Sequence, residues 1–192
     1  MKKLVTGLFV LMVLLSLAIS AEAFESKSIY RDEGVAAYAS WYEYTDGVHT
    51  DKFIQATTSN DGTDIYVSIW TYDENTGDWS DKWGHMFTQE NVFKINNKLK
   101  SATLSPVEIE LYDWNMGTVE TINIAAQWTG VFDVTESSYK YISKYDDFMS
   151  KYSDKSSFRE ATATGSINDE DLGTSDYGEL IKFKSVSMYM EK

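Results

Sequence analysis

Carboxylates and aromatic side chains are the residues of this chain whose types and spacing could do chemistry. The chain has no Cys and 2 His, which rules out a thiolate metal site and a cysteine nucleophile and leaves almost no basis for a multi-histidine metal centre. The motifs Gly-x-Ser-x-Gly and His-Glu-x-x-His, phosphate-binding glycine loops and dinucleotide fingerprints are also absent. We therefore expect neither catalysis nor a resident cofactor.

Glu108 and Glu110 are a pair of carboxylates at a spacing that catalysis can use. Two residues apart on a strand, they would share a face at about 6.5 to 7 Å, a separation used by paired carboxylates in glycoside hydrolysis. The alternate residues Val107, Ile109 and Leu111 are apolar and predict the buried face of the same strand. We expect the two Glu to face solvent, so a glycoside hydrolase is only a remote alternative.

Three acidic segments carry the oxygen ligands that calcium prefers. They are residues 60–64, 73–78 and 168–171, and none has the spacing of an EF-hand loop. Asp and Asn are also favoured in β-turns for backbone reasons. We expect ordinary turns there, and a structural calcium ion is an alternative that no motif supports.

Tyr38, Tyr42, Tyr66 and Trp70 occupy alternate positions of two expected strands. Successive side chains of a strand point to opposite faces, so each strand presents aliphatic residues on one side and aromatic residues on the other. Aromatic rings offer the apolar faces of sugars a broad contact, and neighbouring Asp or Glu can accept hydrogen bonds from hydroxyls. These four residues are the predicted binding surface for extracellular glycan or cell-envelope material.

Further aromatic residues continue this pattern. Tyr44 and Tyr72 extend the same alternation, while Trp79, Trp83 and His85 share one side of a later segment. Two alternatives stay open for the aromatic side. It could form the core, because aromatic residues favour strands whatever their function, or it could be a patch that binds another protein.

The strands that carry these residues follow from period-two patterns of β-branched and aromatic residues. Asp-Gly at residues 46–47 and 61–62 is typical of tight hairpin turns. The expected strands are residues 34–44, 48–59, 63–72, 79–87, 101–104, 107–112, 118–128, 157–166 and 179–190. About nine strands without a linker predict one antiparallel all-β sandwich domain over residues 24–192, jelly-roll or immunoglobulin-like in layout.

One segment departs from the period-two pattern. Tyr141, Tyr145, Phe148, Met149 and Tyr152 recur at roughly helical spacing, and serines that could cap a helix precede them. The spacing predicts one short helix near residues 139–152.

The first residues predict export. Lys2 and Lys3 precede an apolar run, and Ala21-Glu22-Ala23 fits a signal-peptidase site, so residues 1–23 are expected to be a signal peptide cleaved after Ala23. A retained membrane anchor is the alternative, but the run of about 16 residues is shorter than the roughly 17 to 25 that span a bilayer. We expect a secreted or cell-surface protein with no membrane insertion after cleavage.

The charge narrows the choice of partner. The chain has a formal net charge of −13, which becomes −14 when Lys2, Lys3 and Glu22 are removed with the signal peptide. Nucleic-acid binding relies on Lys and Arg that neutralise phosphates, so a surface this acidic argues against it. The expected partners are a glycan or an extracellular protein, and the sequence does not define the oligomeric state.

The sheet edges support a second hypothesis about function. The chain ends on an alternating strand, and an edge strand can pair with another chain by β-augmentation. The alternative function is therefore a surface structural or assembly protein that acts through sheet edges or protein–protein contacts.

Overall fold

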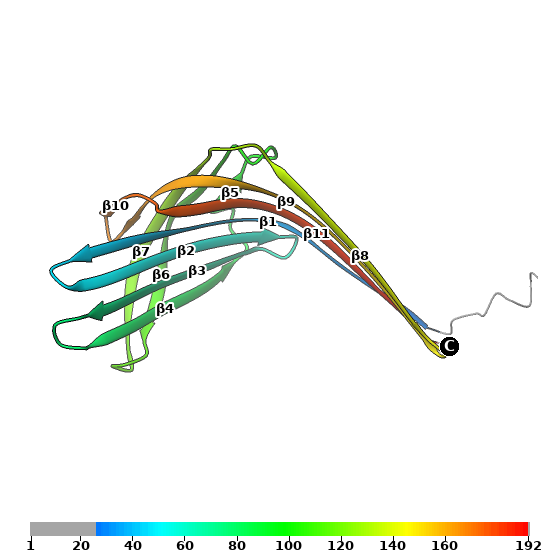
Figure 1. The fold of residues 1–192 in the computed structure, drawn as a ribbon, viewed down its shortest axis with the longest axis horizontal. Coiled ribbons are helices and arrows are strands. Elements are labelled where there is room, and N and C mark those ends of the chain that lie inside the picture. The colour runs from blue at the N-terminus through cyan, green and yellow to red at the C-terminus, as the bar shows by residue number, and fades with distance from the viewer. Residues whose placement is uncertain (1–25, 192) are drawn as a thin grey trace, which may run out of the picture. The chain divides into compact units, whose positions relative to one another are not determined.

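Antiparallel strands make up most of the computed structural model, which describes residues 26–191 (Figure 1). The fold is all-β and sandwich-like, so the predicted fold class is confirmed. Within the described residues, no helix has the length and hydrophobicity needed to cross a membrane. The signal peptide predicted at residues 1–23 lies outside the described part of the chain.

Residues 26–191 form eleven strands. In chain order they are β1 (Ser26–Thr45), β2 (Val48–Ser59), β3 (Thr63–Asp73), β4 (Trp79–Thr88), β5 (Phe93–Ile95), β6 (Ser101–Asp113), β7 (Thr118–Gly130), β8 (Thr135–Tyr145), β9 (Phe148–Ile167), β10 (Glu170–Thr174) and β11 (Tyr177–Glu191).

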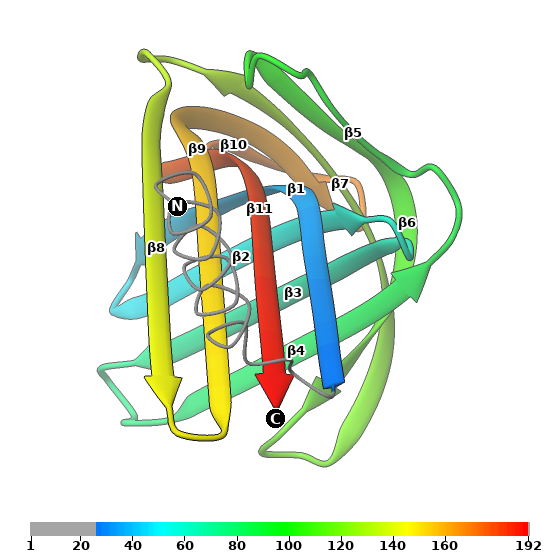
Figure 2. The ribbon, with the colours of Figure 1, turned by 90° about the vertical axis from the view of Figure 1, so that its right-hand side faces the viewer.

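Strand pairing forms a closed circuit. It runs from β1 through β2, β3 and β4 to β6, then through β7 and β9 to β11, which pairs with β1 again. Closure gives each of these strands a partner on both sides and so leaves the circuit without an open edge. Among the described strands, β5, β8 and β10 lie outside it with a single partner each, and Figure 2 shows β8 running beside β9.

The core lies on the aliphatic side of the strands. Ile54, Ile65, Val67, Leu111 and Leu180 are fully buried, and each such side chain contributes roughly 1.5 to 3 kcal/mol relative to an exposed one. They alternate with outward side chains because the strand period is two. This alternation determines which residues of β1 to β4 face solvent.

Contacts divide the described residues into two compact units. The larger comprises residues 32–139 and 154–185, and the smaller comprises residues 26–31, 140–153 and 186–191. In the smaller unit, the ring of Tyr189 lies 5.9 Å from that of Tyr30 and 6.1 Å from that of Phe148. The single domain expected over residues 24–192 stays a prediction.

The prediction of a helix near residues 139–152 is wrong. That segment forms the paired strands β8 and β9, joined by a turn at Asp146 and Asp147. Its aromatic residues are strand formers as well, and pairing with neighbouring strands outweighs a loosely helical spacing.

The strand count also differs from the expected nine. The runs 101–104 and 107–112 are one strand, β6, whose register with β7 shifts between Leu104 and Val107, next to Pro106. Proline cannot donate a ladder hydrogen bond, so it interrupts the pairing without ending the strand. Strands β5, β8 and β10 were not predicted because they are short or lack a buried face.

Gly84→Ala is expected to lower the free energy of unfolding. β4 joins β6 at two paired positions, and a Cβ at Gly84 would lie 2.4 Å from the Glu110 carbonyl oxygen. Overpacking of this kind costs roughly 1 to 3 kcal/mol, measurable by urea denaturation. Ser68→Ala, on the outer side of β3, is the control and should change the value by less than about 0.5 kcal/mol. Equal stability of Gly84→Ala and the wild type would contradict a tight β4–β6 junction.

Candidate functional site

The outward side chains of β1, β2, β3 and β4 form a grid that we call the outer aromatic face. Strand register aligns them in four rows. From β1 to β4 the rows are Tyr38, Gln55, Tyr66 and His85; Ser40, Phe53, Ser68 and Trp83; Tyr42, Asp51, Trp70 and Asp81; and Tyr44, His49, Tyr72 and Trp79. Nine of these sixteen residues are Phe, Tyr or Trp, and none is Lys or Arg.

The outer aromatic face is exposed because its strands bury their other side. Ala37 on β1 and Ile65 on β3 are fully buried in the core, so the residues that alternate with them point away from it. Tyr42 is 53% exposed and Trp70 is 41% exposed. The alternative in which these aromatic residues form the core is therefore contradicted.

The structure brings the four predicted residues together around Phe53. Tyr38 and Tyr66 lie in one row and Tyr42 and Trp70 in another, with the row of Phe53 between them. The ring centroid of Phe53 is 6.0 Å from that of Tyr38 and 6.1 Å from that of Tyr66. Phe53 thus links the residues that sequence analysis selected.

Sequence analysis missed Phe53 as a member of the site, although the alternation of β2 places it on this side. It grouped Trp79 and Trp83, but only the β3–β4 register puts them on the same face as Trp70. The rings of Trp70 and Tyr72 are nearly parallel, with an interplanar angle of 16° and centroids 6.2 Å apart. The face is thus larger than the four predicted residues.

The hydroxyl of Tyr38 is already engaged within the protein. It donates a hydrogen bond to Glu179, and its ring lies 5.8 Å from that of Tyr177. Burial, followed by the hydrogen bond to Glu179, raises the pKa of Tyr38 well above its ordinary value. Tyr38 therefore contributes a neutral, half-buried ring to the face.

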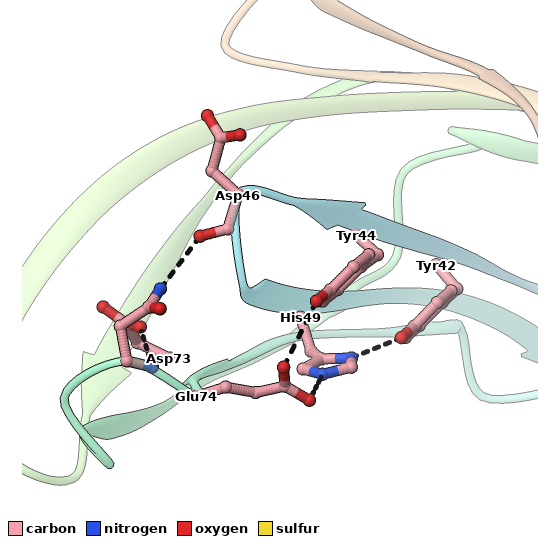
Figure 3. A network of polar contacts seen from close by, with 7 residues as sticks. Tyr42, Tyr44, Asp46, His49, Asp73 and Glu74 are labelled. Atoms are coloured by element: carbon pink, nitrogen blue, oxygen red, sulfur yellow. Dashed lines mark hydrogen bonds and ion pairs between the residues drawn. The ribbon is translucent and has the colours of Figure 1, made fainter.

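His49 is the centre of a polar network at one end of the face (Figure 3). Its Nε2 lies 2.7 Å from Glu74 Oε1, and its Nδ1 is hydrogen-bonded to the Tyr42 hydroxyl. Tyr44 Oη donates to Glu74 Oε2 at 3.2 Å. Both ring nitrogens of His49 therefore have a hydrogen-bond partner. The network thereby holds both tyrosines in place.

Two turns beside this network are hydrogen-bonded to each other. Asp46 and Gly47 join β1 to β2 with positive φ angles of 52° and 84°. The Glu74 backbone N–H donates to the Gly47 carbonyl oxygen at 2.9 Å, and Asn75 Nδ2 donates to the Asp46 carbonyl oxygen at 2.9 Å. A Cβ at Gly47 would lie 2.4 Å from Asn75 Nδ2, so this contact requires glycine.

Asp51 and Asp81 flank Trp70 in its row, one on each neighbouring strand. Burial, and next the charge of Asp176, raises the pKa of Asp51. Ionised carboxylates accept hydrogen bonds but donate none. A hydroxyl-bearing ligand over Trp70 would therefore find an apolar ring with an acceptor on either side.

The other carboxylate candidates lie elsewhere. Glu108 and Glu110 are exposed on β6, and the apolar residues that alternate with them are buried, which confirms the expected faces. Their use in catalysis stays a remote hypothesis.

The acidic segments comprise turns and the ends of the strands beside them. Asp73 Oδ1 accepts the Asn75 backbone N–H at 2.8 Å, and Asp171 Oδ1 accepts that of Gly173 at 2.9 Å. In residues 26–191, no three His, Asp or Glu side chains come close enough together to hold a metal ion. A structural calcium ion stays a hypothesis without support.

Comparisons of the chain with protein-family models, with curated proteins and with solved structures found no match. The functional argument therefore depends on the geometry of the outer aromatic face.

Glu74→Gln is expected to remove a pH-dependent part of the stability. Hydrogen bonds from His49, and then from Tyr44, lower the pKa of Glu74 in the folded state. The ionised carboxylate therefore stabilises the fold above the unfolded pKa of about 4.3, and this contribution is lost as pH falls through the lower folded value. Urea midpoints of the wild type and the variant should differ at pH 7 and converge at acidic pH.

The matched control for that measurement is Glu110→Gln, an exposed carboxylate on β6. Its midpoint should follow that of the wild type at every pH. A Glu74→Gln difference that stays constant from pH 7 to about pH 2 would contradict the role of the ionised carboxylate.

Proposed function

We propose that the protein binds a glycan of the extracellular space or the cell envelope through the outer aromatic face, without catalysing a reaction. The observation that carries this proposal is the grid of exposed aromatic side chains around Trp70 and Phe53. Large contiguous apolar surface on a soluble protein usually marks a binding site. Sugar rings have apolar faces and hydroxyl groups at their edges. Trp70 can contact an apolar face, and the flanking Asp51 and Asp81 can accept hydrogen bonds from the hydroxyls.

The exposure of tryptophan side chains besides Trp70 adds support to the proposal. Of the 6 Trp in the chain, two are buried in the core, while Trp70, Trp79, Trp83 and Trp114 are 41%, 51%, 39% and 64% exposed. Leaving a large apolar side chain in water forfeits the free energy that its burial would supply. A ligand that covers these rings recovers that free energy.

The charges of the face favour a neutral polysaccharide. None of its sixteen grid residues is Lys or Arg, whereas two are Asp. Uronate or sulfate groups would meet like charge here without a cation to pair with. Uncharged sugars lose nothing to this repulsion, and their hydroxyls can donate to the carboxylates.

The dimensions of the face favour a polymer over a single sugar. Four rows, each two residues from the next, extend about 20 Å along the strands. An extended chain could contact several rings at once, and each additional ring would add to the affinity.

Trp70→Ala is expected to weaken polysaccharide binding at least about tenfold, because truncating a central aromatic contact typically costs more than 1.4 kcal/mol. The measurement is depletion of the purified protein by insoluble cellulose, chitin, xylan and isolated cell-envelope material, with and without calcium. Phe132→Ala is the matched control, since Phe132 is 63% exposed but lies outside β1 to β4. It should bind like the wild type.

Two results would contradict the proposal. One is a wild-type protein that none of these materials depletes. The other is binding that Trp70→Ala and Phe132→Ala weaken equally, since that would indicate non-specific adsorption of exposed rings.

A second candidate function, assembly through a sheet edge, is favoured by β8. Among the strands of residues 26–191, β8 pairs with β9 alone, and nearly all of its residues are exposed. Tyr141, Ile142 and Tyr145 are among its exposed apolar residues. Long exposed edge strands with apolar side chains are templates for pairing with another chain.

Ile142→Lys tests this second function, because a charge on an edge strand opposes edge-to-edge pairing. If β8 mediates assembly, light scattering should give a mass that rises with wild-type concentration and a monomer mass for the variant. A monomeric wild type over a wide range of concentrations would exclude self-assembly through this edge.

A further inference from the structure

A cavity of about 570 Å³ in the larger unit is lined by residues of β1, β9 and β11, of the end of β2 and of the turn that follows it. Its volume falls in the range of small-molecule sites, roughly 300 to 1,000 Å³. Val35 contributes to its wall and packs against the core, so the cavity borders the side of β1 opposite to Tyr38. It is therefore separate from the outer aromatic face.

The cavity concentrates positive charge in an acidic protein. Lys155, Lys182 and Lys184 line it, whereas Glu33 is the one carboxylate in its wall. The whole chain has 17 Lys and Arg against 30 Asp and Glu, so three cations with one anion reverse the average balance. Lys182 and Lys184 are two residues apart on β11 and so share a side of the strand.

The lysines are incompletely neutralised. Lys184 Nζ forms an ion pair with Glu33. Among the ion pairs of the described residues, none involves Lys155 or Lys182. Like charges held together raise the free energy of the folded protein unless an anion offsets them. Two cations without a protein partner leave room for an anionic group.

The rest of the wall is suited to an organic molecule. Val35 supplies an apolar surface, while Asn60 and Ser157 supply polar groups that can donate hydrogen bonds. A Cβ at Gly34 would lie 2.5 Å from the Thr58 carbonyl oxygen and 2.8 Å from Phe183 Cζ. Gly34 and Tyr38 share a side of β1, so the Phe183 ring lies on that side, and Val35 provides the apolar part of the cavity wall.

We propose that this cavity binds a small organic anion. Lys155 and Lys182 hold its carboxylate or phosphate group, and Val35 contacts its apolar part. The site does not depend on the glycan proposal, because the two surfaces have opposite charge and lie on opposite sides of β1.

Calorimetric titration of the purified protein tests this site with phenyl phosphate and benzoate, which carry the two candidate anionic groups on the same ring. Benzyl alcohol is the neutral control. We expect saturable 1:1 binding of at least one anion, weakening as sodium chloride is raised, and none of the alcohol. The two anions separate a phosphate site from a carboxylate site.

The double variant Lys155→Gln with Lys182→Gln should weaken that binding at least about tenfold. Lys94→Gln with Lys98→Gln, in and after β5, removes the same charge elsewhere and should leave it unchanged. Amide chemical-shift mapping of the wild type requires no variant, and the shifts should centre on the cavity residues. The proposal is overturned if neither anion saturates, if the alcohol binds equally, or if the shifts lie outside the cavity.

Discussion

The alternation of side chains along β1 to β4 is the constraint on which the rest of the structure depends. Ala37, Ile54, Ile65 and Val67 are buried in the core. Because successive side chains of a strand point to opposite faces, the residues that alternate with them point outward. The outer aromatic face is therefore a consequence of burying the aliphatic side. A shift of one residue in register would exchange the two sides, so the packing of the core also keeps the aromatic grid in place.

Closure of the pairing circuit gives this face a stable base. Each of β1 to β4 has a neighbour on both sides, and β4 reaches β6 where Gly84 allows close approach. The turns that join these strands carry a polar network at the end of the grid, in which Glu74 and His49 hold Tyr42 and Tyr44. Backbone pairing positions the rings, and side-chain hydrogen bonds orient the outermost of them.

The distribution of charge separates two surfaces of the larger unit. The outer aromatic face has carboxylates and no Lys or Arg, whereas the cavity beside β11 is lined by three lysines and one carboxylate. The net charge of the chain is −13, so the local charge of the lysine cluster differs in sign from the average of the chain, whereas that of the acidic face does not. The two surfaces are therefore suited to ligands of different chemistry, one uncharged and one anionic.

The sequence by itself determined the strand class, the turns at residues 46–47 and 61–62, and which residues of β1 and β3 share a side, because these depend on local periodicity and turn chemistry. It did not determine β8, where the spacing of aromatic residues suggested a helix and pairing with β9 decided otherwise. It selected Tyr38, Tyr42, Tyr66 and Trp70, but exposure, the central place of Phe53 and the addition of Trp79 and Trp83 came only from register between strands. The lysine cavity could not be predicted from the sequence either, since β1 and the strands β9 and β11 that line it are more than 100 positions apart. Such contacts depend on which strands become neighbours, and no local pattern encodes that.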